Sequence, residues 1–136
     1  MKLLKQYKIL KEKYFQNIIL LKSGTFYVAY ENDAYILNYL LQYQINDSKI
    51  GFPKSAIDKV LEVLKENNIN FLFEDVKIEY DNNNYNNILY LAKKKYYQEL
   101  NEKILLEQIS FLIKNNPENL SKIRSFIDEF WFYSFK

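Results

Sequence analysis

Lysine and aromatic side chains are the residues of this chain whose types and spacing could bind another molecule. Lys22 comes just before a turn-forming segment that contains Gly24 and Thr25 and ends at Phe26. Lysines also recur at helical spacing near the N-terminus, at Lys2, Lys5, Lys8 and Lys11. An ammonium group can contact a phosphate and an exposed ring can stack on a base, so these groups suggest nucleic-acid binding. The alternatives are a core position for Phe26 and a solvated helix face or strand end for the lysines.

The composition excludes most familiar enzyme chemistry. The 136 residues include no Cys and no His, which removes disulfides, thiol nucleophiles, histidine-based triads and the commonest zinc ligands. Two glycines are too few for either glycine-rich phosphate-binding motif. Glu74 and Asp75 are adjacent in a predicted strand, so their carboxylates would point to opposite faces. We therefore expect no enzyme, no cofactor and no metal.

The net charge of +2 is unevenly distributed. Residues 1–27 carry six lysines and one glutamate, a basic segment that can attract phosphate. The first residues are too weakly apolar for a signal peptide, and the longest aliphatic run, 18–21, is far below the roughly 20 residues of a membrane span. We expect a cytoplasmic protein with no membrane segment.

The hydrophobic pattern of residues 1–80 predicts one α/β domain. Apolar residues spaced by three and four indicate a helix over 2–15, and β-forming runs indicate a hairpin of strands 18–22 and 25–30. Asn32 or Asp33 is predicted to cap the next helix, and Ser55 with Asp58 the one after, which ends at Asn67–Asn68. Residues 46–53 are a loop or short strand, and strands follow at 69–74 and 76–80. This order implies a mixed sheet flanked by helices, an α/β (α+β) fold.

Residues 81–136 have a different pattern. The Asn-rich tract 81–87 is the predicted linker, and residues 88–113 form a helix of some 25 residues that Asn115-Asn116-Pro117 ends. A second helix follows, so residues 88–136 are predicted as a helical hairpin, packed on the same domain. Its aromatic end, Trp131 with Phe130, Phe132, Tyr133 and Phe135, would either dock on the sheet or the long helix or form an oligomer or partner surface. Lys93-Lys94-Lys95 before Tyr96-Tyr97 is a further basic and aromatic group that could stack on a single strand. The alternative is structural, because three consecutive lysines spread around a helix and Tyr96 falls on the apolar stripe.

Five short motifs occur in a recognisable order along residues 6–75. They are Gln6-Tyr7 with Lys11; Ile19-Leu20-Leu21-Lys22-Ser23-Gly24-Thr25-Phe26-Tyr27; Asp33-Ala34; Gly51-Phe52-Pro53-Lys54-Ser55-Ala56-Ile57-Asp58; and Asn68-Ile69-Asn70-Phe71-Leu72-Phe73-Glu74. Both glycines of the chain and one of its two prolines fall within them. This stretch resembles the N-terminal mismatch-recognition domain, domain I, of MutS-type DNA mismatch repair proteins.

The resemblance implies a role for Phe26. In the family, the Phe of Phe-Tyr-Glu wedges into the duplex from the minor groove and stacks on the mispaired base, and the Glu hydrogen-bonds that base. Phe26 keeps the wedge position, whereas Val28 replaces the Glu and Thr25 replaces an Asp. The polar contact to the base is therefore lost.

Two functions follow from the sequence. The first is a stand-alone nucleic-acid-binding module, without ATPase or clamp, that contacts deformable or mismatched duplex DNA through Phe26, Lys22, Gly24, Thr25, Lys8 and Lys11. The second is an accessory protein that reuses the fold as a scaffold and associates with itself or a partner through the 88–133 hairpin. Val28 and the small net charge favour the second.

Overall fold

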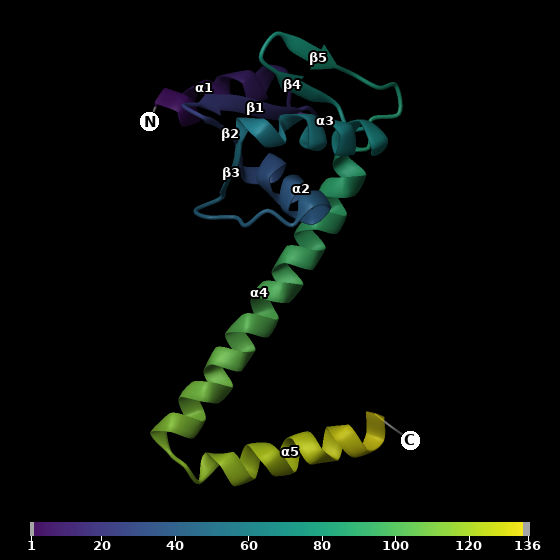
Figure 1. The fold of residues 1–136 in the computed structure, drawn as a ribbon. Coiled ribbons are helices and arrows are strands. Elements are labelled where there is room, and N and C mark those ends of the chain that lie inside the picture. The colour runs from purple at the N-terminus through teal and green to yellow at the C-terminus, as the bar shows by residue number, and fades with distance from the viewer. Residues whose placement is uncertain (1, 135–136) are drawn as a thin grey trace. The chain divides into compact units, whose positions relative to one another are not determined.

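A computed structural model describes residues 2–134, and the chain divides into two compact units, Met1–Tyr96 and Tyr97–Lys136 (Figure 1). The first unit begins with α1 (Lys2–Lys13), β1 (Ile18–Ser23), β2 (Phe26–Tyr30), α2 (Glu31–Leu41) and β3 (Lys49–Pro53). It continues with the 3-10 turn η1 (Lys54–Ala56), α3 (Ile57–Glu66), β4 (Phe71–Phe73) and β5 (Val76–Ile78). The helix α4 (Tyr85–Asn115) starts in the first unit and ends in the second, which also contains α5 (Asn119–Ser134).

The strands of the first unit form one mixed sheet in the order β3-β2-β1-β4-β5. The central strand β1 pairs antiparallel with β2 and parallel with β4, and the outer pairs are antiparallel. Because β1 and β4 run parallel, a long crossover must connect them, and α2, β3 and α3 lie within it. The predicted α/β (α+β) fold is confirmed.

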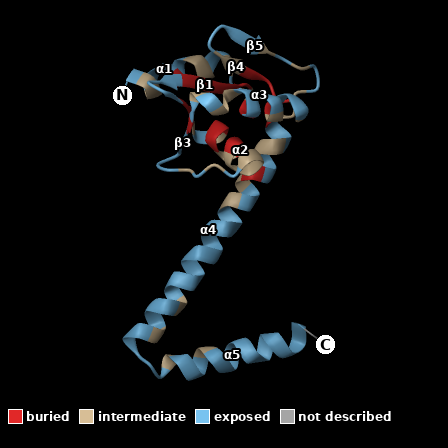
Figure 2. Cartoon of the chain, viewed as in Figure 1, coloured by how far each residue is buried: buried red, intermediate tan, exposed pale blue. Residues whose placement is uncertain are grey.

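The two faces of the sheet carry separate apolar cores, because side chains alternate along β1. Ile19 and Leu21 face α1 and pack with Tyr7 and Val28. Ile18 and Leu20 face the opposite side, in a larger cluster that includes Ile36 and Leu37 of α2 and Val60 and Leu64 of α3. Figure 2 shows the buried residues concentrated in the strands and in α2. The sheet is thus covered by α1 on one face and by α2 and α3 on the other (Figure 1).

The helix starts differ from those predicted. Tyr30 precedes α2 and Ala56 precedes α3, and neither helix start has a side-chain cap. The predicted caps, Asn32 or Asp33 and Ser55, are therefore wrong: α2 already includes residues 32 and 33, and Ser55 lies in the 3-10 turn. The end of α3 is as expected, because Asn68 takes the left-handed conformation, with φ 54°, that asparagine tolerates.

The Asn-rich tract is bonded to the rest of the first unit. The side-chain amide of Asn83 donates to the Gln16 carbonyl oxygen at 2.9 Å, and its oxygen accepts from the Asn70 N–H at 3.0 Å. The helix α4 begins at Tyr85, inside the tract, and runs for 31 residues rather than some 25. Tyr85 and Ala92 are buried, and Ile88 and Leu89 pack against the larger core cluster.

The second unit is the end of α4 followed by α5, joined through Asn116–Glu118. The break after Asn115 is where the sequence places it. No residue of α5 is buried (Figure 2). Phe135 of the predicted aromatic end lies outside the described residues. Among residues 2–134, no helix is long and apolar enough to cross a membrane.

Candidate nucleic-acid interface

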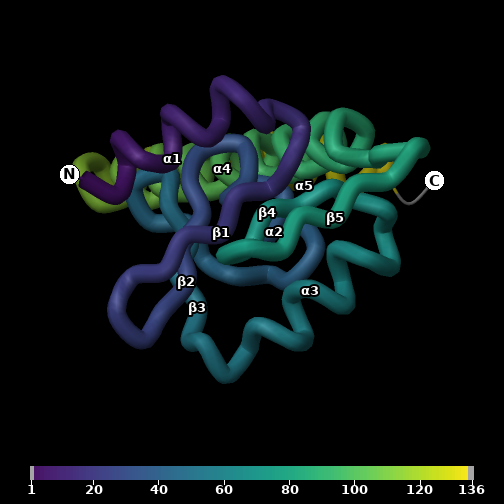
Figure 3. The backbone as a smooth tube through the Cα atoms, turned by 90° about the horizontal axis from the view of Figure 1, so that it is seen from above, coloured from purple at the N-terminus to yellow at the C-terminus, as the bar shows by residue number. Residues whose placement is uncertain are grey.

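The turn between β1 and β2 lies at the margin of the sheet (Figure 3). Four of the six predicted binding residues are in or beside this turn: Lys22, Gly24, Thr25 and Phe26. Ser23 pairs with Phe26 across the hairpin, so Gly24 and Thr25 form a two-residue loop. Gly24 has a φ of +62°, and Thr25 is not in the left-handed region, which is the pattern of a type II′ turn. The N–H of Lys54 donates to the Thr25 carbonyl oxygen at 3.0 Å, which ties the turn to the end of β3.

Phe26 is a surface residue at this tip. It is the first residue of β2, opposite Ser23 on one side and Pro53 on the other, and its side chain is 47% exposed. The next two residues, Tyr27 and Val28, are buried. The core alternative for Phe26 therefore does not describe this structure, and the exposed ring can stack on a flat apolar group.

Two cations lie together beside the tip. Lys22 is exposed, and its ammonium group lies close enough to Lys54 to hold the pKa of Lys54 below its usual value. The Glu74 carboxylate opposes this shift and accepts a hydrogen bond of 2.9 Å from the Tyr27 hydroxyl. A bound anion would relieve the repulsion between the two ammonium groups. Lys54 is not among the binding residues predicted from the sequence, although its place directly after Gly51-Phe52-Pro53 in the fourth motif is a signal for it.

Val28 lies on the face of the sheet that α1 covers. It shares one face of β2 with Phe26, but its side chain is 4% exposed and packs with Tyr7, Ile19 and Leu21 beneath α1. The residue offers no polar atom to a base. Recognition at this tip would have to rely on Phe26 and on the nearby cations.

The four lysines predicted to form a row on α1 divide into two groups. Lys2, Lys5 and Lys8 are exposed, as a phosphate-facing row requires. Lys11 instead points inward: its Nζ lies 2.8 Å from Asp33 Oδ1 and 3.1 Å from the Tyr85 hydroxyl, and it donates to the Asn17 carbonyl oxygen. Burial lowers the pKa of Lys11, while the Asp33 carboxylate acts in the opposite direction. Its ammonium group is thus occupied by partners inside the domain and does not line the candidate interface.

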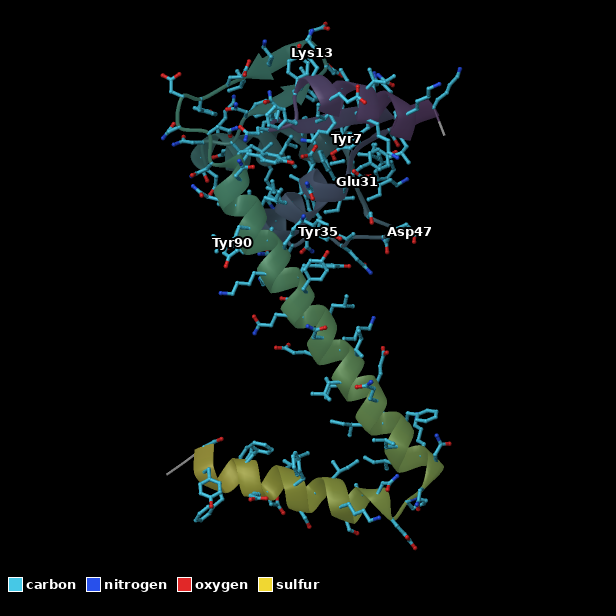
Figure 4. All side chains as sticks on the ribbon, turned by 180° about the vertical axis from the view of Figure 1, so that it is seen from behind. Tyr7, Lys13, Glu31, Tyr35, Asp47 and Tyr90 are labelled. Carbon is cyan, nitrogen blue, oxygen red and sulfur yellow. The ribbon has the colours of Figure 1, made fainter. Side chains whose placement is uncertain are left out.

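Asp33 is the centre of this buried network. Its Oδ2 accepts from the Tyr7 hydroxyl at 2.8 Å and from the Ile19 N–H at 3.0 Å, and its Oδ1 accepts from Lys11 and Tyr85. Tyr7 lies on the sheet side of α1 (Figure 4). Burial, with the nearby Asp33 charge, raises the pKa of both Tyr7 and Tyr85 far above the usual tyrosine range. The network links α1, β1, α2 and the first turn of α4.

Comparison with known proteins decides the family. The family profile described as MutS domain I matches residues 1–72, just over half of the chain. This chain belongs to the MutS domain I family. Over 68 residues it is also 40% identical to the DNA mismatch repair protein MutS of Thermosipho melanesiensis. That alignment covers 47% of this chain and 8% of the relative, so the chain matches only a small part of that protein's length.

Four of the five motifs meet at two places in this structure, while the fifth contains β4. Tyr7, Lys11 and Asp33, from the first and third motifs, meet in the buried network, so their contribution is structural. The second and fourth motifs meet at the tip, where Thr25 bonds Lys54 and Phe26 lies beside Pro53. The candidate interface is therefore the hairpin tip, defined by the exposed residues Lys22, Gly24, Thr25 and Phe26 with the half-buried Lys54.

The second basic and aromatic group is partly engaged within the first unit. The ring of Tyr96 packs edge-on against Tyr35, with centroids 4.9 Å apart, and Lys95 Nζ lies 5.8 Å from the centre of the Tyr39 ring. These contacts favour the structural alternative for Lys95 and Tyr96. In the described part of the chain, no cluster of three or more acidic side chains could hold a metal ion.

Proposed function

We propose that this chain is a stand-alone MutS domain I module that binds duplex DNA through the hairpin tip and favours deformable or mismatched base steps. The observation that carries the proposal is the half-exposed ring of Phe26 beside the paired cations Lys22 and Lys54. The proposed role is recognition, with no reaction catalysed.

The chemistry of the tip suits this role. An apolar ring inserted from the minor groove unstacks a base step, and a mismatched step is cheaper to unstack. Lys22 and Lys54 would hold adjacent phosphates, and Lys8 of α1 is a further exposed candidate contact. Because Val28 supplies no hydrogen bond, discrimination would come from deformability rather than from the identity of the base.

Fluorescence anisotropy on labelled matched duplex, mismatched duplex and single-stranded DNA tests the proposal. Binding should be strongest to mismatched duplex and should weaken about tenfold between about 50 and about 200 mM salt, as expected for some two phosphate contacts. Phe26→Ala should abolish the preference for the mismatch, because the wedge is removed. Its matched control is Phe15→Ala, which truncates another exposed phenylalanine, 66% exposed, away from the tip.

The cations need a separate test. Lys22→Gln with Lys54→Gln should weaken binding to all duplexes alike and flatten the salt dependence. Lys59→Gln, an exposed lysine on α3, is the matched control. If neither the Phe26 nor the lysine substitutions change the affinity for DNA, the assignment of the tip as the binding surface is overturned. If the chain binds no DNA at low salt, DNA as the ligand is overturned.

A second function is favoured by Val28. Its apolar side chain stands where MutS domain I has a base-contacting Glu, and it packs into the domain core. If the chain binds no DNA, the fold serves as a scaffold for a protein interaction.

A further inference from the structure

A groove of about 320 Å³ lies between α1 and β4, on the face of the sheet that α1 covers. It forms because β1 is longer than its neighbour. The strand β4 ends at Phe73, which pairs with Leu20, so residues 21–23 of β1 extend beyond it toward the hairpin tip. This α1–β4 groove falls in the size range of small-molecule sites, roughly 300 to 1,000 Å³.

The α1–β4 groove has an aliphatic lining with a few polar groups. Its apolar walls include three leucines: Leu10, Leu21 and Leu72. The exposed Gln6 adds a side-chain amide that can both donate and accept hydrogen bonds. Glu74 also lines the groove, but its carboxylate accepts a hydrogen bond of 2.9 Å from Tyr27, which belongs to the core of the opposite face. Such a lining suits a flat ring with hydrogen-bonding edges, the chemistry of a nucleobase.

The α1–β4 groove is continuous with the hairpin tip. Phe26 lies diagonally across the strand pair from Leu21 on one face, a separation of roughly 7 to 8 Å that an aromatic side chain can span. Ser23, directly opposite Phe26, is small and exposed, so it obstructs the path between them little. Lys22 lines the groove and also forms the cation pair of the tip with Lys54. A single nucleotide can thus place its base in the groove and its phosphate beside Lys22.

We infer that the α1–β4 groove receives the base that Phe26 displaces, so that a mispaired nucleotide is turned out of the duplex and held between α1 and β4. The inference rests on the proposed DNA binding at the tip and states where the unstacked base goes. Proteins that extrude a base hold it by apolar contacts and by hydrogen bonds to its edge. Because a mispaired base is extruded at lower cost than a paired one, the groove adds to the preference for mismatches.

A duplex that carries 2-aminopurine as one of the mispaired bases tests this inference on the full chain. The fluorescence of 2-aminopurine is low while it stacks in DNA or on an aromatic ring, and it rises when the base leaves the stack. At saturating protein we expect about a threefold rise, because the groove lining is aliphatic. The free 2-aminopurine nucleotide should show no binding at the concentration that saturates with the duplex. Equally tight binding of the free nucleotide would overturn duplex DNA as its source.

Anisotropy of the same duplex separates this inference from the DNA proposal. If the duplex binds but the fluorescence stays low, the base remains stacked in DNA or on Phe26, which overturns the groove as its receiver and leaves DNA binding intact. If the duplex does not bind at low salt, both proposals are overturned.

Two exposed glutamines offer a matched pair of variants. Gln6→Glu replaces the amide in the groove by a carboxylate, which repels the phosphate of an entering nucleotide, and it should remove at least half of the fluorescence rise. Gln44→Glu makes the same change in the loop before β3, at the end of that strand away from the tip, and should leave the rise unchanged. Equal signals from the two variants would overturn the groove as the site that holds the base.

Discussion

The Nζ of Lys11 lies 2.8 Å from Oδ1 of Asp33, although 22 residues separate them in the chain. The carboxylate is fully buried and the ammonium mostly so. Two tyrosine hydroxyls and a backbone N–H complete the shell of donors around Asp33, so its charge is compensated in the interior. Four elements of the first unit depend on this one carboxylate.

Asp33→Asn should therefore destabilise the protein strongly. The substitution leaves the Lys11 ammonium buried without its counter-charge, a change that costs about 3 to 5 kcal/mol in comparable pairs. Urea denaturation followed by circular dichroism measures it, with the exposed Asp58→Asn as control, expected within about 0.5 kcal/mol of the parent. Equal stability of the two variants would contradict the network's importance.

Stability should fall at alkaline pH. Burial raises the folded-state pKa of Tyr7 and Tyr85, so the unfolded chain loses these protons near pH about 10 while the folded chain keeps them. The unfolded state then binds fewer protons, and the free energy of unfolding decreases as pH rises above about 10. The lowered pKa of Lys11 acts in the opposite direction, but only between that pKa and about 10.5, above which the tyrosines set the slope.

Tyrosinate absorbance and far-ultraviolet circular dichroism, recorded on the same titration, measure this effect. The last tyrosines should ionise only as the helical signal is lost. A single ionisation step near pH about 10 with the fold intact would show that neither hydroxyl is protected.

Tyr85→Ala should show that the start of α4 belongs to the first unit. It removes a buried ring and one donor to Asp33, and we expect a loss of about 3 to 5 kcal/mol. Tyr90→Ala is the matched control, because Tyr90 lies on the same helix and is 68% exposed. Chemical denaturation of both variants makes the comparison. Similar unfolding midpoints would show that the start of α4 does not stabilise the first unit.

The two glycines should respond differently to alanine. Gly24→Ala should cost about 1 kcal/mol, because its φ of +62° strains an L-residue even though a Cβ would meet no atom within 4 Å. At Gly51, a Cβ would meet Val28 Cγ1 at an ordinary 3.7 Å, so Gly51→Ala should be neutral or slightly stabilising. Thermal melting of both variants decides this, and an equal loss for the two would contradict the turn geometry.

The sequence predicted the sheet and its layers because local patterns determine them. The spacing of Leu3, Tyr7 and Leu10 defines the inner face of α1, and the run at 18–21 places alternate residues on the two faces of β1. The inward turn of Lys11 could not be foreseen, since its partners Asp33 and Tyr85 are 22 and 74 residues away. For the same reason Asp33 was interpreted as a helix cap.

The candidate site was predictable in part. The motif order placed Phe26 and Lys22 at a turn, and the structure puts both on the surface there. Lys54 joins them only because β3 pairs with β2, a register that no local pattern specifies. The DNA-binding role of these residues stays a prediction until it is measured.

The network around Asp33 also sets where this domain can be cut or transplanted. The stretch matched by the family profile stops at residue 72, within β4, yet Tyr85 donates to Asp33 from beyond it. A graft limited to residues 1–72 would carry an interrupted strand, an edge without β5 and a buried carboxylate with one donor missing. A graft that extends through Tyr96 contains the whole of β4, its partner strand β5 and the Tyr85 donor. The segment that must move as one piece is therefore longer than the segment that the family profile matches.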